Sequence, residues 1–514
     1  MGRKAKLKRA FVFLICIIGG QIGLAQERYS VGAEQSFSTG DHEPLWLNAN
    51  RYGLSSLDKS NGYVRAGLFR DLQPSDSTSS IAWGYGADVA VAYNFTSSFV
   101  LQQAYAEAQW KALGVTAGSK EWPMELKNQE LSSGSQTFGA NARPIPQLRV
   151  GLPDYVAIPY TKGWLSIKGF CAYGMTTDDQ WQKDFTNGQS RYTKNVIFHS
   201  KAAYLRFGRR GVTFELGMED GCQFGGTSFI SPYTTMENRK GIPSFFNALV
   251  GGGTDVTDGN YKNTEGNHVG SWNMRLNIDR PVWQLGLYID QVFEDNSMMV
   301  HIAHNGWGER ENAYEHVRSR YFIYDFKDGM LGAELKLKKA TWLNNIVVEF
   351  LTTKYQGGPV YHDVTYNVGE HITGRDNYYN HSLYTGWQHW GQVMGNPLFR
   401  SPIYNDDGRI EVQNNRFVAW HFGLAGDPVK GLHYRMLAST QKGYGTYYHV
   451  YPEPRRNLSL MAEASYHFSE HSQLSGWNVR CAWGMDRGKI YGDNMGLQLS
   501  VTKTGLLNLH KHKK

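Results

Sequence analysis

Cysteine is scarce in this 514-residue sequence, and no apolar run is long enough for a membrane-spanning helix. The four cysteines, Cys16, Cys171, Cys222 and Cys481, are too scattered for a disulfide framework or a zinc knuckle. A mean hydropathy of −0.48 excludes a helical membrane protein. No basic stripe interleaved with aromatic residues is present, so nucleic acid is not an expected partner.

The first residues are typical of an export signal. Five cations precede the short apolar run of residues 10–18, and small residues follow at positions 23–25. We therefore expect residues 1–25 to be a cleaved signal peptide and residues 26–514 to form a single domain. Removing the five cations lowers the net charge from +7 to +2, so the mature chain is almost neutral.

Tyrosine, tryptophan and glycine are abundant, with 31, 15 and 57 residues. Many segments alternate strictly between apolar and polar residues, which places successive side chains on opposite faces of a strand. Trp272, Met274, Leu276 and Ile278 share one face in this way. The same pattern recurs in residues 212–218, 283–290, 331–337, 458–468, 477–483 and 495–501.

The connections distinguish a barrel from a soluble sandwich, which would also alternate. Short turns at residues 209–210, 280–281, 339–345, 426–431 and 470–475 are interleaved with long polar loops at 219–271, 292–330, 353–409 and 440–457. That asymmetry is typical of outer-membrane proteins. The sequence predicts an all-β fold, an antiparallel outer-membrane β-barrel of about 18 strands between Leu45 and Thr502. Both termini are expected in the periplasm, and four prolines weaken the strand pattern between residues 121 and 159.

Several segments resemble the Wzi family of capsule-assembly proteins. They are residues 131–147, with the run NARPIPQ, residues 284–295 (QLGLYIDQVFED), 328–332 (DGMLG), 349–359 (EFLTTKYQGGP), and the Gly-Trp and Gly-x-Pro-Leu motifs within 384–398. The resemblance implies an eighteen-stranded outer-membrane barrel. It also implies a lectin-like role, in which the barrel helps to anchor capsular polysaccharide at the cell surface.

The sequence departs from this family at both ends. Residues 26–43 are too short and too polar for the helical periplasmic segment of better-known members. The last predicted strand ends on Leu506 and Leu507 instead of an aromatic residue, which leaves the register of the closing strand open.

A polysaccharide site is expected in the extracellular loops, where aromatic faces stack on sugars and charged groups bind hydroxyls. Residues 353–402 are rich in both kinds of side chain. The alternative is that these aromatics form a membrane girdle or the packed core of a loop. The candidate polysaccharide-binding residues are Tyr361, Asp363, Arg375, Asp376, Tyr378, Tyr379, Trp387 and Trp390.

Charged residues on the inward face of the strands are interpreted as partners that neutralise one another across a filled lumen, with a pore lining as the alternative. They are Arg275, Asp279, Asp290, Glu334 and Glu349. The spacing of the loop histidines fits no compact metal site, so solvated histidines and no metal are expected. These are His301, His304, His362, His371, His381 and His389.

No catalytic motif of a known hydrolase is present, although Glu219 and Asp220 mark a place where an envelope hydrolase site could lie. We therefore predict a non-enzymatic protein without cofactors, located in the bacterial outer membrane and surrounded by its lipid. The expected protein is a monomer that binds capsular or another surface polysaccharide. The alternative function is a porin-like channel for oligosaccharides or small solutes.

Overall fold

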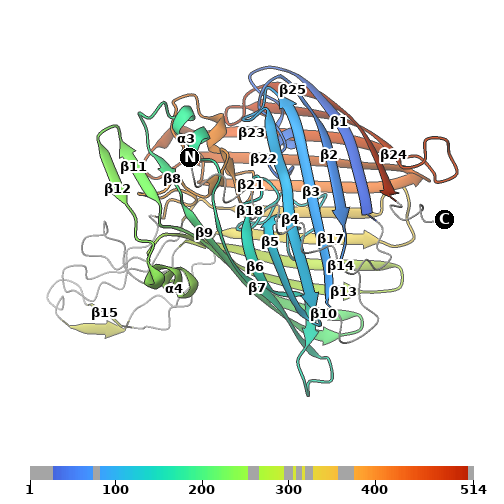
Figure 1. The fold of residues 1–514 in the computed structure, drawn as a ribbon, viewed down its shortest axis with the longest axis horizontal. Coiled ribbons are helices and arrows are strands. Elements are labelled where there is room, and N and C mark those ends of the chain that lie inside the picture. The colour runs from blue at the N-terminus through green and yellow to red at the C-terminus, as the bar shows by residue number, and fades with distance from the viewer. Residues whose placement is uncertain are drawn as a thin grey trace, which may run out of the picture.

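The computed structural model describes residues 27–72, 81–252, 265–294, 305–307, 315–318, 328–356 and 376–507. They form a closed antiparallel sheet of eighteen strands, in which each strand pairs with its neighbours along the chain and the last pairs with the first (Figure 1). The predicted signal peptide lies outside the described residues. The barrel strands are β1 (Glu27–Thr39), β2 (Ser60–Arg70), β3 (Ala82–Tyr93), β4 (Phe99–Trp110), β5 (Leu113–Ser119), β6 (Gln147–Ala157), β7 (Leu165–Met175), β9 (Ile197–Arg209), β10 (Val212–Phe224), β13 (Asn267–Asp279), β14 (Trp283–Glu294), β17 (Gly329–Leu337), β18 (Asn345–Thr352), β21 (Phe417–Val429), β22 (Leu432–Gly445), β23 (Val450–His467), β24 (Trp477–Gly488) and β25 (Asn494–Leu507).

The two ends of the barrel differ as the sequence predicts. Tight turns join the strands at one end, for example at residues 111–112, 210–211 and 430–431, and Glu27 pairs there with Leu507. Long connections gather at the other end (Figure 1). They hold α2 (Leu45–Asn48), α3 (Asp179–Phe185), α4 (Ile242–Val250), the 3-10 helix η3 (Pro402–Tyr404), β8 (Tyr192–Lys194), β11 (Thr227–Ser231), β12 (Thr234–Glu237), β15 (Asn305–Trp307), β16 (His316–Arg318), β19 (Gln388–His389) and β20 (Gln392–Val393). We call these the short-turn end and the loop end.

The predicted strand number is confirmed, but the predicted start is wrong. The first strand is β1, a largely polar segment that precedes the predicted span, whereas Leu45–Asn48 forms the buried helix α2 against β23 and β24. The long loop predicted at residues 440–457 is also wrong. β22 and β23 extend through most of it, and only residues 446–449 turn between them.

The closing strand has a defined register. β25 pairs with β1 over thirteen residue pairs, from Glu27 with Leu507 to Thr39 with Met495. In the proline-rich region, β5 and β6 belong to the barrel, and Pro153 lies where the β6–β7 register shifts between Leu152 and Val156. The residues between these strands, 120–146, are a connection at the loop end.

The outer surface of the barrel is apolar, as the alternation predicts. Val64 is 59% exposed and Leu331 55% exposed, on strands that lie far apart in the sequence. Aromatic side chains flank this apolar band at both ends, as the interfaces of a bilayer favour. Phe37, Phe99 and Trp420 lie toward the loop end, and Trp110, Trp164 and Trp342 lie at the short-turn end. Within the described residues, no helix has the length and apolarity needed to cross a membrane.

The lumen contains paired charges. Arg275 Nη2 lies 2.6 Å from Glu334 Oε2, which confirms the prediction that these inward groups neutralise one another. Arg435 and Glu463 form a second such pair at 2.8 Å. The prediction is wrong for Asp279, because this carboxylate is half exposed at the short-turn end and pairs there with Lys338.

One charged network faces outward. Lys201 on β9, and Asp220 on β10 with its neighbour His268 on β13, lie on the side of the sheet opposite the lumen. Lys201 Nζ is 2.5 Å from Asp220 Oδ2, and His268 Nδ1 is 3.3 Å from Asp220 Oδ1. We call these three residues the outer charged network.

Helix α4 covers the outer charged network. It packs on β9 and β10, and Lys201 Nζ donates to the carbonyl of Ala248 in its last turn (3.1 Å). The side chains of Asp220 and His268 have no exposed surface as a result. The opposite face of α4 exposes Ile242, Phe246 and Val250, so the helix continues the apolar exterior over the charges.

Candidate functional site

Two connections from the loop end fold into the lumen and fill its middle. The first plug segment comprises residues 120–146, between β5 and β6, and the second comprises residues 376–416, before β21. Their apolar side chains form one core with the inward face of the barrel wall. Leu131, Tyr379, Trp387 and Phe399 in this core have no exposed surface.

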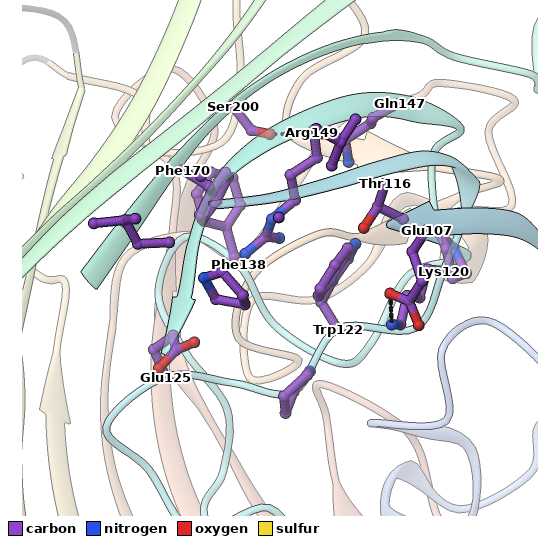
Figure 2. Close-up of a pocket in the computed structure, with 18 of the residues that line it drawn as sticks. Glu107, Thr116, Lys120, Trp122, Glu125, Phe138, Gln147, Arg149, Phe170 and Ser200 are labelled. Carbon is purple, nitrogen blue, oxygen red and sulfur yellow. Dashed lines mark hydrogen bonds and ion pairs between the residues drawn. The ribbon is translucent and has the colours of Figure 1, made fainter. Parts of the chain in front are cut away.

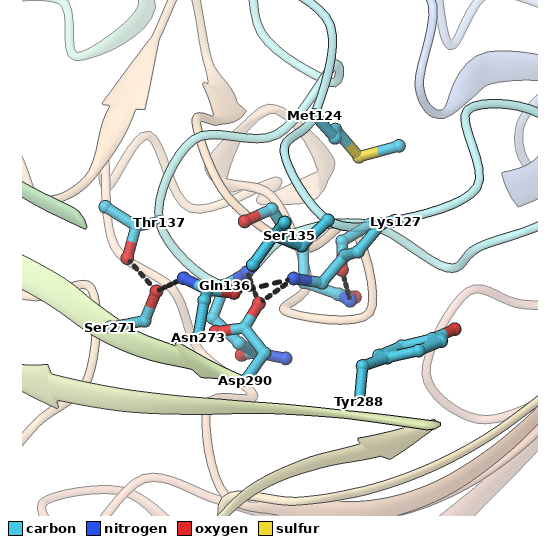
Figure 3. Close-up of polar contacts among 12 residues, drawn as sticks. Met124, Lys127, Ser135, Gln136, Thr137, Ser271, Asn273, Tyr288 and Asp290 are labelled. Atoms are coloured by element: carbon cyan, nitrogen blue, oxygen red, sulfur yellow. Dashed lines mark hydrogen bonds and ion pairs between the residues drawn. The ribbon is translucent and has the colours of Figure 1, made fainter. Parts of the chain in front are cut away.

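The first plug segment is fixed to the wall by buried carboxylates. Lys127 Nζ lies 2.6 Å from Asp290 Oδ2 on β14, and the Gln136 backbone N–H donates to the same oxygen (2.9 Å; Figure 3). Thr137 Oγ1 donates to Ser271 Oγ on β13 (3.0 Å). Each charge is thereby partnered inside a region that excludes water, as a buried ion pair requires.

Glu349 on β18 makes a second anchor. Its carboxylate accepts hydrogen bonds from Ser132 Oγ (2.6 Å) and from the Ser133 backbone N–H (2.8 Å). The Tyr288 hydroxyl on β14 donates to it as well (2.6 Å). Glu349 therefore binds the plug instead of lining an open pore, and hydrogen bonds from neutral donors satisfy its buried oxygens.

The second plug segment packs on the first. Trp387 Nε1 donates to the carbonyl of Thr137 (2.9 Å), and Asn396 Nδ2 donates to the carbonyl of Gly134 (2.9 Å). Trp387 also lies against the wall at Gly221, where an added Cβ would sit 2.4 Å from its Cη2 atom. A larger residue than glycine at position 221 would therefore push this ring out of its place.

The second plug segment also contacts the connection after the first strand and the turn before the last strand. Gln392 Nε2 donates to Ser55 Oγ in the connection after β1 (2.9 Å). The Tyr491 hydroxyl, in the turn before β25, donates to the carbonyl of Pro397 (3.1 Å). The second plug segment thus contacts connections next to both β1 and β25, the two strands that close the barrel.

The structure places the candidate polysaccharide-binding residues in three groups. Asp376 is half buried and Trp390 is partly exposed. The aromatic rings of a second group, Tyr378, Tyr379 and Trp387, have no exposed surface, so they pack in the plug and offer no face to a sugar. Tyr361, Asp363 and Arg375 lie outside the described residues.

Trp390 is the predicted aromatic residue best placed to meet a ligand. Its backbone lies in the left-handed region (φ 55°), which a non-glycine residue rarely adopts without support. That support comes from Asp178, which accepts its backbone N–H (3.0 Å), and from Thr177 Oγ1, which accepts Nε1–H (3.2 Å). The Arg143 guanidinium lies 4.2 Å from the ring centre. Burial lowers the pKa of Arg143 to about 10, so the group stays protonated at neutral pH.

His389, next to Trp390, is fully buried, so the prediction of a solvated histidine is wrong here. The Thr177 backbone N–H donates to Nε2 (3.1 Å), and Nδ1–H donates to the carbonyl of Arg143 (2.7 Å). This ring is neutral, because both nitrogens are used and burial lowers its pKa. His381 is half buried, while His301, His304, His362 and His371 lie outside the described residues.

Acid is expected to loosen the plug through His389. The unfolded chain takes up a proton near pH 6.5, whereas the folded ring resists it, so stability falls as the pH is lowered below about 6.5. The unfolding temperature of the purified protein, followed from pH 7.5 to pH 5, should drop further for the wild type than for His389→Gln. Parallel pH profiles for the two proteins would contradict this role.

A chamber of about 1100 Å³ lies between the plug and the wall formed by β4–β9 (Figure 2). Its lining runs from Phe138 in the first plug segment to Leu72, Pro153 and Asp154 near the short-turn end. The chamber therefore extends along the lumen from the plug toward the short-turn end. Pairs of opposite charge line it, such as Lys120 with Glu107 at 2.6 Å.

Comparison with known proteins supports the fold. No family model and no curated protein matches the sequence. The solved structure of Escherichia coli Wzi, described as a carbohydrate-binding β-barrel involved in group 1 capsule assembly, has a TM-score of 0.54 and 12% identity, with 96% of this chain and 87% of that chain covered. Pseudomonas aeruginosa OccK5 (OpdH) gives a TM-score of 0.46 and 8% identity, covering 95% and 100%.

This chain is a bacterial outer-membrane β-barrel. The closed sheet, its apolar exterior and its aromatic borders are those of the fold. Its short-turn end faces the periplasm and its loop end faces the outside, as in other barrels of this kind. The plug consequently closes the extracellular side, and the chamber extends toward the periplasm.

Glu219 and Asp220 do not face a common site. Glu219 points into the lumen, where it accepts the hydroxyl hydrogen of Tyr204 (2.6 Å), while Asp220 belongs to the outer charged network. Adjacent residues of a strand point to opposite faces, so the two carboxylates cannot act on one substrate. Across the described ranges, no group of three or more potential metal ligands is found.

The sequence did not identify residues 120–146 as a plug of the lumen, or Arg149 on β6 as a candidate binding residue. The plug segment does carry a signal, since few residues in the stretch 131–147 are charged although it lies in a loop. Serine, asparagine and threonine side chains there form hydrogen bonds with the wall and with the second plug segment. Among the described residues Arg149 has no ion-pair partner, which is a property of the folded chamber and has no counterpart in the sequence.

Proposed function

We propose that this outer-membrane barrel binds a surface polysaccharide at its extracellular end and thereby contributes to capsule assembly or attachment. The observation that carries the proposal is the plug, because a lumen filled by two mutually bonded segments suits a binding protein better than a channel. The resemblance to the Wzi family and the carbohydrate binding stated for the E. coli structure point the same way.

The exposed edge of the second plug segment supports a sugar-binding role. Trp390 presents an aromatic face whose orientation is fixed by the hydrogen bond from Nε1–H to Thr177 Oγ1, and Arg143 adds a positive charge beside it. Aromatic faces favour the apolar faces of sugar rings, and a guanidinium binds hydroxyls or acidic groups. Asp376 belongs to the proposed site as well, and so do Tyr361, Asp363 and Arg375. Tyr378, Tyr379 and Trp387 would contribute only by supporting this edge from within the plug.

Replacing Trp390 with Ala is expected to weaken binding of the producing strain's own capsular polysaccharide about tenfold, since one stacking surface is lost. Binding is measured by titration of the purified protein in detergent. Trp342→Ala is the matched control, because Trp342 is 73% exposed at the opposite, periplasmic end. The control should bind like the wild type.

The same variants test the cellular role. In a deletion strain, capsule should shift from the cell-bound to the shed fraction. The wild-type gene and Trp342→Ala should restore retention, and Trp390→Ala should restore it only in part. Full retention of capsule in the deletion strain would refute the proposed role. We retain the monomeric state and the absence of enzymatic activity as parts of the same proposal.

A porin-like channel is the second candidate, and the chamber is the observation that favours it. Transport would require the plug to leave the lumen. Conductance across a planar bilayer separates the two functions, because a barrel with its plug in place should pass little current.

A further inference from the structure

Arg149 is a cation without a polar partner in the periplasmic chamber. It lies on the lumen face of β6, and within the described part of the chain no hydrogen bond or ion pair to its guanidinium is found. Several charged residues around it are paired, while the carboxylate of Glu219, which also lines the chamber, accepts a hydrogen bond from Tyr204. Lys168 Nζ lies 2.7 Å from Glu125, and Arg206 Nε lies 2.7 Å from Glu215.

Two aromatic rings hold this guanidinium. Its Cζ atom lies 3.8 Å from the ring centre of Trp122, in the first plug segment, and 3.4 Å from that of Phe170 on β7. Figure 2 shows Arg149 reaching from the wall into the space beside Trp122 and Phe138. Stacking fixes the plane of the group and occupies its faces, so its N–H donors remain for a ligand at the edge.

The surroundings define the ligand further. Trp122, Phe138 and Phe170 offer apolar surface, and Thr116 and Ser200 offer hydroxyl groups close by. An unpaired guanidinium favours a carboxylate, which it binds through two parallel hydrogen bonds. A cavity of about 1100 Å³ admits a ligand of several rings. Acidic sugars combine a carboxylate, hydroxyl groups and apolar ring faces.

We propose that the chamber binds a carboxylate-bearing oligosaccharide from the periplasmic side, with Arg149 holding its acidic group. Arg143, which lies against Trp390, also lines the chamber, but the site around Arg149 does not depend on the function proposed for the Trp390 edge. The chamber would then hold an acidic saccharide on the periplasmic side of the plug.

Titration with tri-galacturonic acid tests the site in the purified full-length protein. The wild type should bind it, and Arg149→Gln should weaken binding about tenfold to a hundredfold, as loss of hydrogen bonds to a charged group predicts. Arg209→Gln, which removes a cation outside the chamber at the same end of the barrel, should bind like the wild type.

The probes separate the possible sources of an anion. A neutral trisaccharide of galactose and inorganic phosphate should each bind much more weakly than tri-galacturonic acid. Equal binding of the neutral sugar, or unchanged binding by Arg149→Gln, would overturn the proposal. If Arg149→Gln fails to fold, Arg149→Lys keeps the charge but loses the planar double hydrogen bond, and its affinity should still fall.

Discussion

The Lys127→Met protein is expected to conduct ions across a planar bilayer, whereas the wild type passes little current. Both side chains of the Lys127–Asp290 pair are almost completely buried, at 1% and 0% exposure. Removing the cation leaves a carboxylate in a region without water, which costs about 3–5 kcal/mol. Because that pair fixes the first plug segment to β14, the lost free energy weakens the attachment of the plug to the barrel wall.

Lys338→Met provides the control. Its partner Asp279 is half exposed, so the substitution should change stability by no more than about 1 kcal/mol and leave the lumen closed. The double substitution Lys127→Met with Asp290→Leu removes both charges and should conduct less than Lys127→Met alone. A Lys127→Met protein as closed as the wild type would show that this pair does not hold the plug.

Deleting helix α4 is expected to have the other large effect. If residues 242–250 are replaced by a short Gly/Ser linker, Lys201, Asp220 and His268 meet lipid instead of the helix. A charge on the lipid face destabilises an outer-membrane barrel by about 2–4 kcal/mol at the bilayer midplane and by less toward the interface, and here three charged groups lose their cover together. The amount of folded protein in the outer membrane, measured by its altered migration after heating, should therefore fall sharply.

Neutralising the network should rescue the deletion. Lys201→Met, Asp220→Leu and His268→Leu together remove the charges, and folded protein should return in the absence of α4. Replacing the tip of the β11–β12 hairpin, residues 232–233, is the control for disturbing the same loop, and it should be tolerated. A triple variant that fails to restore the deletion protein would mean that α4 does more than cover these charges.

The barrel was predictable because lipid imposes a period of two on every wall strand. Leu331 and Leu497 expose their side chains as alternation requires, and Arg275 and Glu334 meet on the other face. The first strand escaped prediction because β1 is polar over much of its length, and Gln35 interrupts the apolar face on which Val31 and Phe37 are exposed. Its place is set by pairing with β2 and β25, which is a property of the closed sheet.

The candidate site was predictable only in part. The aromatic residues near position 390 suggested ligand binding, yet Trp387 is plug core while Trp390, three residues later, is partly exposed. Tyrosine and tryptophan suit both environments, because each joins a large apolar ring to a polar group. Which one is buried depends on wall residues such as Gly221, whose missing side chain leaves room for the Trp387 ring.

The hydrogen bonds that join the second plug segment with Ser55 and with Tyr491 have a consequence for biogenesis. Ser55 follows the first strand and Tyr491 precedes the last, so both bonds form beside the seam where the ring is sealed. Pairing of the first and last strands and insertion of the plug into the lumen therefore stabilise each other, because the two events share contacts. A nascent chain that closes its barrel while this loop is still outside would lack these bonds. Correct assembly therefore depends on the order in which plug insertion and barrel closure occur.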